Sequence, residues 1–162
     1  MIGMKKVTAG EVSHIVPRHT WTSGRAYIGW DSDDATIYDK AFYIITSEFK
    51  VYKCIEAGAG ASTVEPVHIN TQPTAESDGY KWKYMYSLTS AETLNFMSTD
   101  FIHASTDSTV SAAAVDGALD TALVVAGGSS YSLSTGSTIT AIPIRGDGSS
   151  GVCSVTIASG AV

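Results

Sequence analysis

The chain has little of what marks several protein classes. Its 162 residues include two cysteines, Cys54 and Cys153, too few for the disulfide framework of a small secreted domain. Both stand in apolar, strand-like contexts, where a free cysteine behaves as a small hydrophobic residue, so a reducing compartment is expected, with a single disulfide as the alternative. No run approaches the ~20 apolar residues of a membrane span. Residues 1–11 lack the apolar stretch of a signal peptide, and no membrane partner is expected.

Positive charge is also scarce. The chain has ten Lys and Arg residues and 16 Asp and Glu residues, which gives a net charge of −6. Up to Lys83 the balance is nine basic against ten acidic residues, or −1, and from Tyr84 onward it is one against six, or −5. Phosphate contacts need clustered basic residues, so no nucleic-acid partner is expected. The asymmetry favours a composition change between domains; the alternative is an acidic face that docks on a basic partner.

Signatures of catalysis and of metal binding are missing. The four residues between His14 and His19 include Pro17, which disfavours a shared helical face for zinc. The acidic cluster at residues 30–34 (WDSDD) lacks the glycine and distal glutamate of an EF-hand loop. No G-x-S-x-G is present, and Cys54 has no neighbouring histidine. No catalytic residue, metal ligand, cofactor or enzymatic activity is therefore predicted, although a Ser-His-acid assembly from distant residues stays open.

Short β-rich runs dominate the first two thirds. Residues 12–16 read as a strand that ends at Pro17, residues 41–46 (AFYIIT) and 49–55 (FKVYKCI) as a hairpin, and residues 101–104 as extended. Residues 18–34 form a structured loop for which three aromatic anchors are expected, Trp21, Tyr27 and Trp30.

An alternating aromatic segment follows a long polar loop. Four aromatic residues alternate with two lysines and a methionine, which is the period of a strand with one buried face: Tyr80, Trp82, Tyr84 and Tyr86. A core face is favoured over an exposed platform that stacks sugars or bases. We therefore expect Trp82 to hold the fold together and partners to bind at loops and edges elsewhere.

One clear helix signal and a tail of different composition complete the chain. Thr89 and Glu92 fit a capping box, and Ala91, Leu94 and Met97 lie at helical spacing on one face. The predicted helix is short and should end near Asp100. From residue 105 the chain is rich in Ser, Thr, Gly, Ala and Val, with strands expected at 122–126, 138–144 and 152–158 and a hairpin around GDGSSG. The tail is typical of half a β repeat, which suggests a fragment of a longer protein.

These patterns predict a mainly β fold with antiparallel sheets in a two-layer arrangement and one short helix near residues 90–99. The expected domains are a β region at 1–104 and a Ser/Thr/Gly-rich β module at 105–162.

Three ordered blocks of residues resemble one known family. The blocks are IVPR at 15–18 with a following Trp, VYKCI at 51–55 extended by STVEP at 62–66, and DGYKWKY at 78–84. They are similar to the baseplate wedge subunit of contractile-tailed bacteriophages, a family of dimeric, mostly β proteins, over about residues 12–104. The matching positions are Pro17, Arg18, Trp21, Tyr52, Cys54, Glu65, Pro66, Asp78, Gly79, Tyr80, Trp82 and Tyr84.

The resemblance implies a structural role without enzymatic activity. It implies other baseplate wedge proteins as partners, a homodimer in the full-length protein, and a place in the virion after assembly in the host cytoplasm. Two further functions remain open: a carbohydrate- or receptor-binding tail adhesin module, and a cell-wall hydrolase, which would require a pair of carboxylates ~5–10 Å apart.

Overall fold

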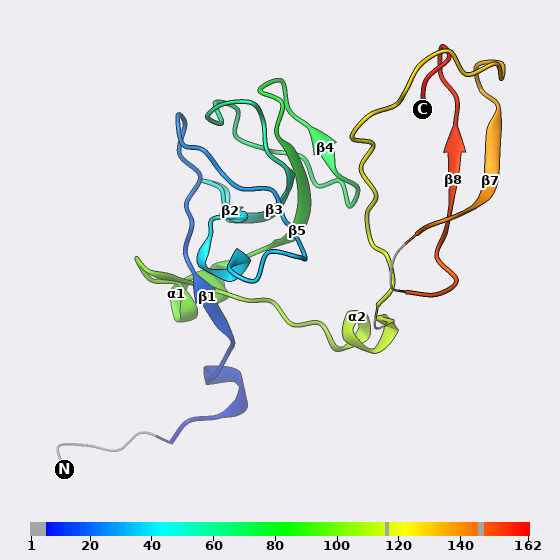
Figure 1. Cartoon of the computed structure of the whole chain (residues 1–162). Coiled ribbons are helices and arrows are strands. Elements are labelled where there is room, and N and C mark those ends of the chain that lie inside the picture. Colours follow the sequence, from blue (N-terminus) through cyan, green and yellow to red (C-terminus); the bar gives the residue numbers. More distant parts are fainter. Residues whose placement is uncertain (1–5, 116, 146–147) are drawn as a thin grey trace. The chain divides into compact units, whose positions relative to one another are not determined.

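The computed structural model describes residues 6–115, 117–145 and 148–162 (Figure 1). The chain divides into two compact units, Met1–Thr106 (unit 1) and Asp107–Val162 (unit 2), a boundary two residues from the one expected. The strands form antiparallel sheets, so the predicted mainly β class is confirmed. No helix among the described residues is both long enough and apolar enough to cross a bilayer.

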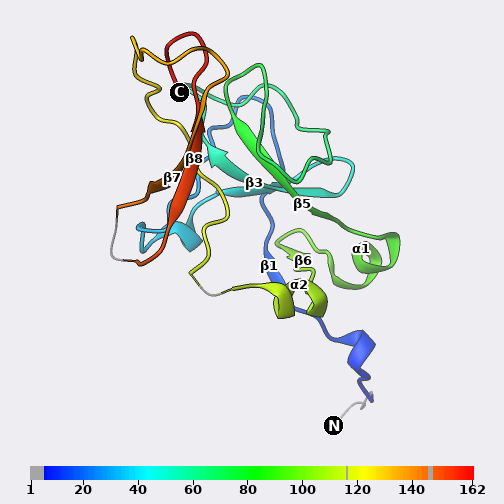
Figure 2. The same ribbon diagram turned by 90° about the vertical axis from the view of Figure 1, so that its right-hand side faces the viewer.

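A four-stranded antiparallel sheet is the centre of unit 1. Its order is β2-β3-β5-β4, formed by β2 (Tyr43–Ile45), β3 (Lys50–Glu56), β5 (Lys81–Ser87) and β4 (Thr74–Ala75). The expected hairpin is confirmed as the β2–β3 pair. The long pair β3–β5 lies side by side in both views of the ribbon (Figures 1 and 2). Two 3-10 turns, η1 (Ala9–Glu11) and η2 (Ile37–Asp39), lie outside the sheet.

A β-bulge divides the aromatic strand β5. Tyr52 lies opposite Tyr84 and the preceding Val51 lies opposite Tyr86, so Met85 has no residue opposite it. One extra residue in a strand turns the following side chains to the other face of the sheet. The prediction of four aromatics on one face is therefore right for the first three and wrong for Tyr86, because alternation alone cannot reveal a bulge.

The first core cluster covers one face of the sheet. Trp82 has no exposed surface, stacks on Tyr80 at 5.6 Å between ring centroids, and meets Tyr27 edge-on at 5.6 Å. Tyr27 comes from the loop for which it was expected as an anchor. Complete burial of a large apolar side chain stabilises the fold by ~2–3 kcal/mol. The buried members of the cluster are Tyr27, Ile44, Tyr52, Cys54, Tyr80 and Trp82.

A smaller layer packs on the opposite face. It consists of the antiparallel pair β1 (Ile15–Pro17) and β6 (Phe101–His103), together with α1 (Ser90–Phe96). Val16, Tyr86 and Met97 pack around its buried cluster, which comprises Ile45, Val51, Leu88 and Ile102. β1 ends at Pro17, as the sequence predicts, since proline cannot donate to a continuing ladder. This layer leaves part of the sheet face uncovered.

Helix α1 begins with the predicted capping box. The Thr89 hydroxyl accepts from the Glu92 backbone N–H, and the Glu92 carboxylate accepts from the Thr89 N–H. The helix ends at Phe96, four residues before the expected end. Of the apolar residues expected on one face, Met97 packs on the second cluster whereas Leu94 is 85% exposed.

Unit 2 contains α2 (Ser108–Ala113), β7 (Thr138–Pro143) and β8 (Val152–Thr156). The predicted hairpin is confirmed as the antiparallel β7–β8 pair, although turn residues 146 and 147 lie outside the described residues. Residues 122–126 are not a strand, which corrects the sequence prediction, because no neighbouring strand pairs with them among the described residues. Helix α2 was not predicted, since its only clear signal is the Asp107 cap, which accepts from the Thr109 N–H at 2.7 Å.

Candidate interaction groove

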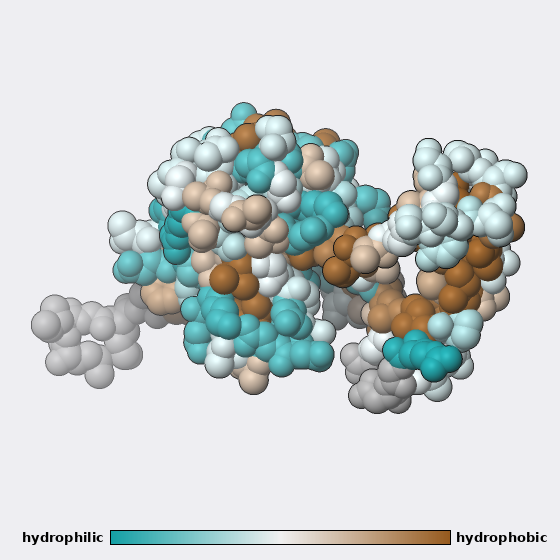
Figure 3. All heavy atoms as spheres, turned by 45° about the horizontal axis from the view of Figure 1, so that its top comes forward, coloured by the Kyte–Doolittle hydropathy of each residue, from teal (hydrophilic) through white to brown (hydrophobic). Residues whose placement is uncertain are grey.

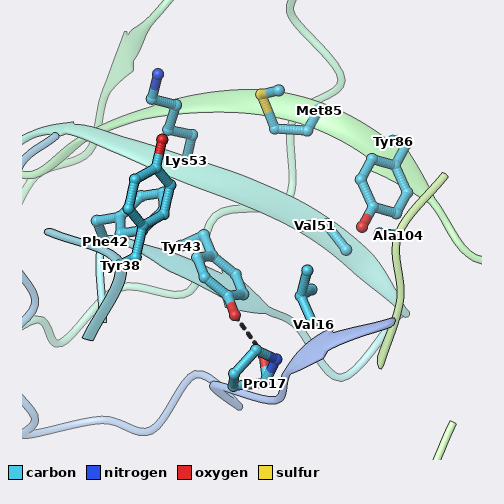
Figure 4. Close-up of a pocket in the computed structure, with 10 residues that line it drawn as sticks. All are labelled: Val16, Pro17, Tyr38, Phe42, Tyr43, Val51, Lys53, Met85, Tyr86 and Ala104. Atoms are coloured by element: carbon cyan, nitrogen blue, oxygen red, sulfur yellow. Dashed lines mark hydrogen bonds between the residues drawn. The ribbon is translucent and has the colours of Figure 1, made fainter. Parts of the chain in front are cut away.

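The uncovered part of the central sheet in unit 1 is hollowed into a groove of about 340 Å³ (Figure 4). Its lining comes from five stretches of the chain: β1, residues 38–43 from η2 into β2, β3, β5, and the residue that follows β6. The groove is lined by Val16, Pro17, Tyr38, Phe42, Tyr43, Val51, Lys53, Met85, Tyr86 and Ala104. Five separate segments of the chain therefore meet at one apolar surface.

Two of the phenol groups that line the groove make hydrogen bonds within the protein itself. The Tyr43 hydroxyl donates to the Pro17 carbonyl at 2.6 Å, shown by the dashed line in Figure 4. The Tyr86 hydroxyl donates to the His103 carbonyl at 2.9 Å. Burial, with a smaller contribution from neighbouring Tyr86, raises the pKa of Tyr43 to about 12. Both rings therefore act as apolar walls, and neither phenol is suited to exchange a proton near neutral pH.

The rim of the groove carries exposed apolar residues beside one cation. Tyr38 is 75% exposed and Met85 is 47% exposed. The Lys53 ammonium lies 4.0 Å from the centroid of the Trp30 ring, in a cation–π contact. Trp30 also meets Phe42 edge-on at 4.8 Å. Contiguous apolar surface rimmed by polar groups marks interaction sites on soluble proteins.

Of the twelve family-matching residues, five are buried, and Trp21 and Tyr84 pack against the first core cluster. Tyr52, Cys54, Pro66, Tyr80 and Trp82 are buried. Burial, together with two nearby carboxylates, raises the pKa of the Cys54 thiol to about 12, which excludes it as a thiolate nucleophile at neutral pH.

Asp78 holds the long loop between β3 and β4. Its Oδ2 accepts from the Ser62 hydroxyl at 3.0 Å and from the backbone N–H groups of Thr63 and Val64 at 2.8 and 3.0 Å. Its Oδ1 accepts from the Tyr80 N–H at 3.2 Å. Burial raises the pKa of Asp78, but these four hydrogen bonds together lower it further, so that the pKa lies below its ordinary value.

Trp21 and Gly79 also stabilise the region around Asp78. The Trp21 indole N–H donates to the Ser62 hydroxyl at 3.1 Å, which links the first loop to the Asp78 carboxylate. Gly79 has φ of +87°, as expected for a glycine that sets the turn into β5. Within β5, the Tyr84 hydroxyl lies 2.8 Å from the Ser87 hydroxyl.

The other two charged family-matching residues, Arg18 and Glu65, also bind neutral groups. The Arg18 guanidinium donates to the Thr20 hydroxyl at 2.9 Å and to the Ser98 carbonyl at 3.0 Å. The Glu65 carboxylate accepts from the Ser47 N–H at 2.7 Å and caps the turn between β2 and β3. Among the twelve matching residues, Pro17 alone lines the groove.

A Ser-His-Glu series does come together from distant residues. His103 Nδ1 lies 2.5 Å from the Ser13 hydroxyl, and its Nε2 lies 3.2 Å from Glu92 Oε1. In Ser-His-Asp hydrolases the serine contacts Nε2 and the carboxylate contacts Nδ1, so the order is reversed. His103 is 9% exposed, and its ring stacks on Phe96 at 5.5 Å. We assign the series a structural role that ties β6 to α1 and to the segment before β1.

The described residues contain no group of three His, Cys, Asp or Glu side chains that could hold a metal ion. In the WDSDD cluster, Asp31 accepts from the Asp33 N–H at 3.0 Å. Asp34 accepts from Lys40 Nζ at 2.5 Å and from the Thr36 hydroxyl. These hydrogen bonds, that of Lys40 above all, lower the pKa of Asp34 to about 2. The cluster is a turn whose carboxylates bind their own chain.

Comparisons of the chain with protein-family models, with curated proteins and with solved structures found no match. The functional argument therefore depends on the groove and on the residues themselves. Sequence reasoning missed Tyr38, Phe42 and Met85 as groove residues, because only the fold brings η2 and the residue before β2 next to β5. It also placed Tyr86 in the core, and the bulge at Met85 is what brings that ring to the groove.

Proposed function

We propose that the protein is a structural component of a phage tail baseplate wedge that acts through protein–protein contacts. The observation that carries this proposal is the apolar groove of unit 1, an uncovered sheet face lined by aromatic, aliphatic and methionine side chains. Aromatic residues and methionine are enriched in protein interfaces, while most charged residues are depleted. We infer that the groove receives a side-chain cluster or an extended segment of a neighbouring protein.

The lining favours a protein over a small polar ligand. Small-molecule pockets combine an apolar lining with a few placed polar groups that orient the ligand. Here the Tyr43 and Tyr86 hydroxyls already donate to carbonyls of their own chain. Lys53 is the one charged residue among those that line the groove. What the surface offers a partner is mainly shape and apolar area.

The resemblance to the wedge subunit supports the same proposal. Its three blocks supply the core residues Tyr52 and Trp82 and the loop-holding Asp78 of unit 1. Under the proposal, the partners are other baseplate wedge proteins, the protein resides in the virion, and it needs no cofactor, nucleic acid or membrane.

The proposal is tested on purified phage particles that carry this gene. Mass spectrometry of the particles and immunogold labelling with an antibody against unit 1 should detect the protein at the tail baseplate. Absence of the protein from complete particles, or label confined to the capsid, contradicts the proposal.

A second candidate function is carbohydrate binding by a tail adhesin module. Its motivation is the exposed ring of Tyr38, which lies 5.9 Å from Trp30 and 6.2 Å from Phe42. Sugars stack on exposed aromatic faces, which excludes the fully buried Trp82 from this role. Glycan-array binding that is lost in Tyr38→Ala supports the candidate, and an array without signal for the wild type removes it.

A further inference from the structure

Unit 2 has almost no core of its own. Among its described residues, Ile157 alone is buried, at 1% exposure. Figure 3 shows hydrophobic atoms at the surface of this unit. An isolated two-stranded hairpin is marginally stable in water, and a unit of this size needs a substantial core. The large exposed apolar residues include Val110, Leu119, Leu123, Val124, Val125, Tyr131, Leu133, Ile139, Ile144 and Val152.

The two strands of the unit differ in how their edges are protected. β7 contains Pro143 and a bulge between Ile139 and Ile142, within which Ala141 has φ of +56°. Proline and bulges are two devices that stop a strand edge from pairing further. β8 (VCSVT) has no proline, glycine or charged residue, and it is rich in β-branched side chains. The open edge of the hairpin is therefore that of β8.

The register fixes which backbone groups lie on that edge. Ile157 donates to the Ser137 carbonyl at 2.9 Å, and Gly151 accepts from the Ile144 N–H at 2.8 Å, so both direct their backbone groups toward the β7 side. Backbone directions alternate along a strand. The N–H and C=O groups of Val152, Ser154 and Thr156 consequently point away from β7. The described sheet has two strands, and these groups form a template for a third.

The same unit carries a segment suited to that template. Residues 122–126 (ALVVA) are uncharged and apolar, and the sequence predicts a strand there. Val125 is 96% exposed and Val124 is 57% exposed, and among the described residues the segment belongs to no strand or bridge. Its C-terminal neighbour Gly127 is held beside the chain end, since the Gly127 carbonyl accepts from the Val162 N–H at 2.8 Å.

We propose that residues 122–126 of one copy add as a strand to the β8 edge of a second copy, in a reciprocal exchange. Each copy offers one donor segment and one open edge, so a two-fold pair satisfies both at once. Neither segment carries a charge, which keeps the acidic residues of unit 2 out of the contact. The exchange gives each hairpin a third strand and covers apolar surface that unit 2 alone leaves in water.

Two single substitutions in the whole chain test the donor segment (residues 122–126) and the β8 edge independently. Val124→Lys places a charge on the donor segment, whereas Ser154→Pro removes an N–H that points away from β7. Val110→Lys is the matched control for charge, because Val110 is 67% exposed on α2. Sedimentation equilibrium should give a dimer for the wild type and for Val110→Lys. Each of the other two variants should raise the dimer dissociation constant at least tenfold.

Mixing the variants gives the decisive result. The Val124→Lys chain keeps its edge and the Ser154→Pro chain keeps its donor, so an equimolar mixture should form a heterodimer through one exchanged strand. A peptide of residues 118–128 should bind to Val124→Lys and fail to bind to Ser154→Pro. A wild type that is monomeric at tens of micromolar overturns the proposal. A dimer that survives both variants also overturns it, because the contact then lies elsewhere. Neither outcome bears on the presence of the protein in phage particles, so this test stands apart from that of the proposed function.

Discussion

Tyr84 and Tyr86 lie on opposite faces of the central sheet, although a single residue separates them. That residue, Met85, is the extra residue of a β-bulge. On the neighbouring strand β3, the partners of Tyr86 and Tyr84 are the adjacent residues Val51 and Tyr52. Tyr84 packs on the cluster that holds Trp82, whereas Tyr86 joins the other cluster and forms a wall of the groove. The groove thus depends on a local irregularity in an otherwise alternating strand.

Deletion of Met85 should be tolerated. The shortened strand would place Tyr86 opposite Val51 without a bulge, so every buried side chain keeps its face. Deletion of Lys83 is the matched control, since it moves Trp82 to the face opposite Tyr84. The melting temperature of the Met85 deletion should fall by a few degrees, within ~1 kcal/mol of wild-type stability, whereas the Lys83 deletion should leave unit 1 unfolded. The reverse order of stability would contradict the assigned register.

Trp82→Ala should destabilise unit 1 by about 3–5 kcal/mol, the cost of a large cavity in a packed core. Trp82 has no exposed surface and contacts the rings of Tyr27 and Tyr80. Urea unfolding followed by the fluorescence of Trp21 and Trp30 measures the change, because both lie in unit 1. A loss below about 1 kcal/mol would show that Trp82 is not central to the core.

Asp78→Asn should cost about 2–3 kcal/mol at pH 7, because an amide cannot accept all four hydrogen bonds that the carboxylate accepts. The pKa of Asp78 is lower in the folded state than its ordinary value of about 3.9. The folded state therefore binds this proton more weakly than the unfolded state does. The stabilisation is complete above about pH 4 and is lost as pH falls toward the folded pKa.

Stability measured from pH 7 down to pH 2 checks that sign. The difference between wild type and Asp78→Asn should be constant near neutrality and should shrink below pH 4. A difference that grows as the pH falls would contradict the assigned hydrogen bonds.

Cys54 should resist alkylation in the folded protein. Its side chain is fully buried, and burial raises the pKa of its thiol to about 12, so that almost no thiolate is present at pH 8. Iodoacetamide labelling of the Cys153→Ser variant, read by mass spectrometry with and without urea, isolates this thiol. Labelling without urea at the rate of a free peptide thiol would show that the core opens at Cys54.

The sequence predicted the elements whose signals are local. The β2–β3 hairpin, the capping box at Thr89 and the end of β1 at Pro17 each depend on a few neighbouring residues. The groove could not be predicted, because it depends on the bulge at Met85 and on segments far apart in the chain. The expected strand at 122–126 has the right composition, but a strand also needs a hydrogen-bonded neighbour.

Under the proposed function, the role of the groove is tested most directly by photo-crosslinking within assembled phage particles. A photoreactive phenylalanine analogue replaces Tyr38 at the groove rim, and the matched control replaces Ile69, which is 67% exposed but does not line the groove. We expect the probe at position 38 to crosslink to another tail protein and the probe at position 69 to give no such product. Particles that contain the protein but yield no crosslink from position 38, or equal crosslinking from both positions, would contradict the assignment of the groove as the partner-binding surface.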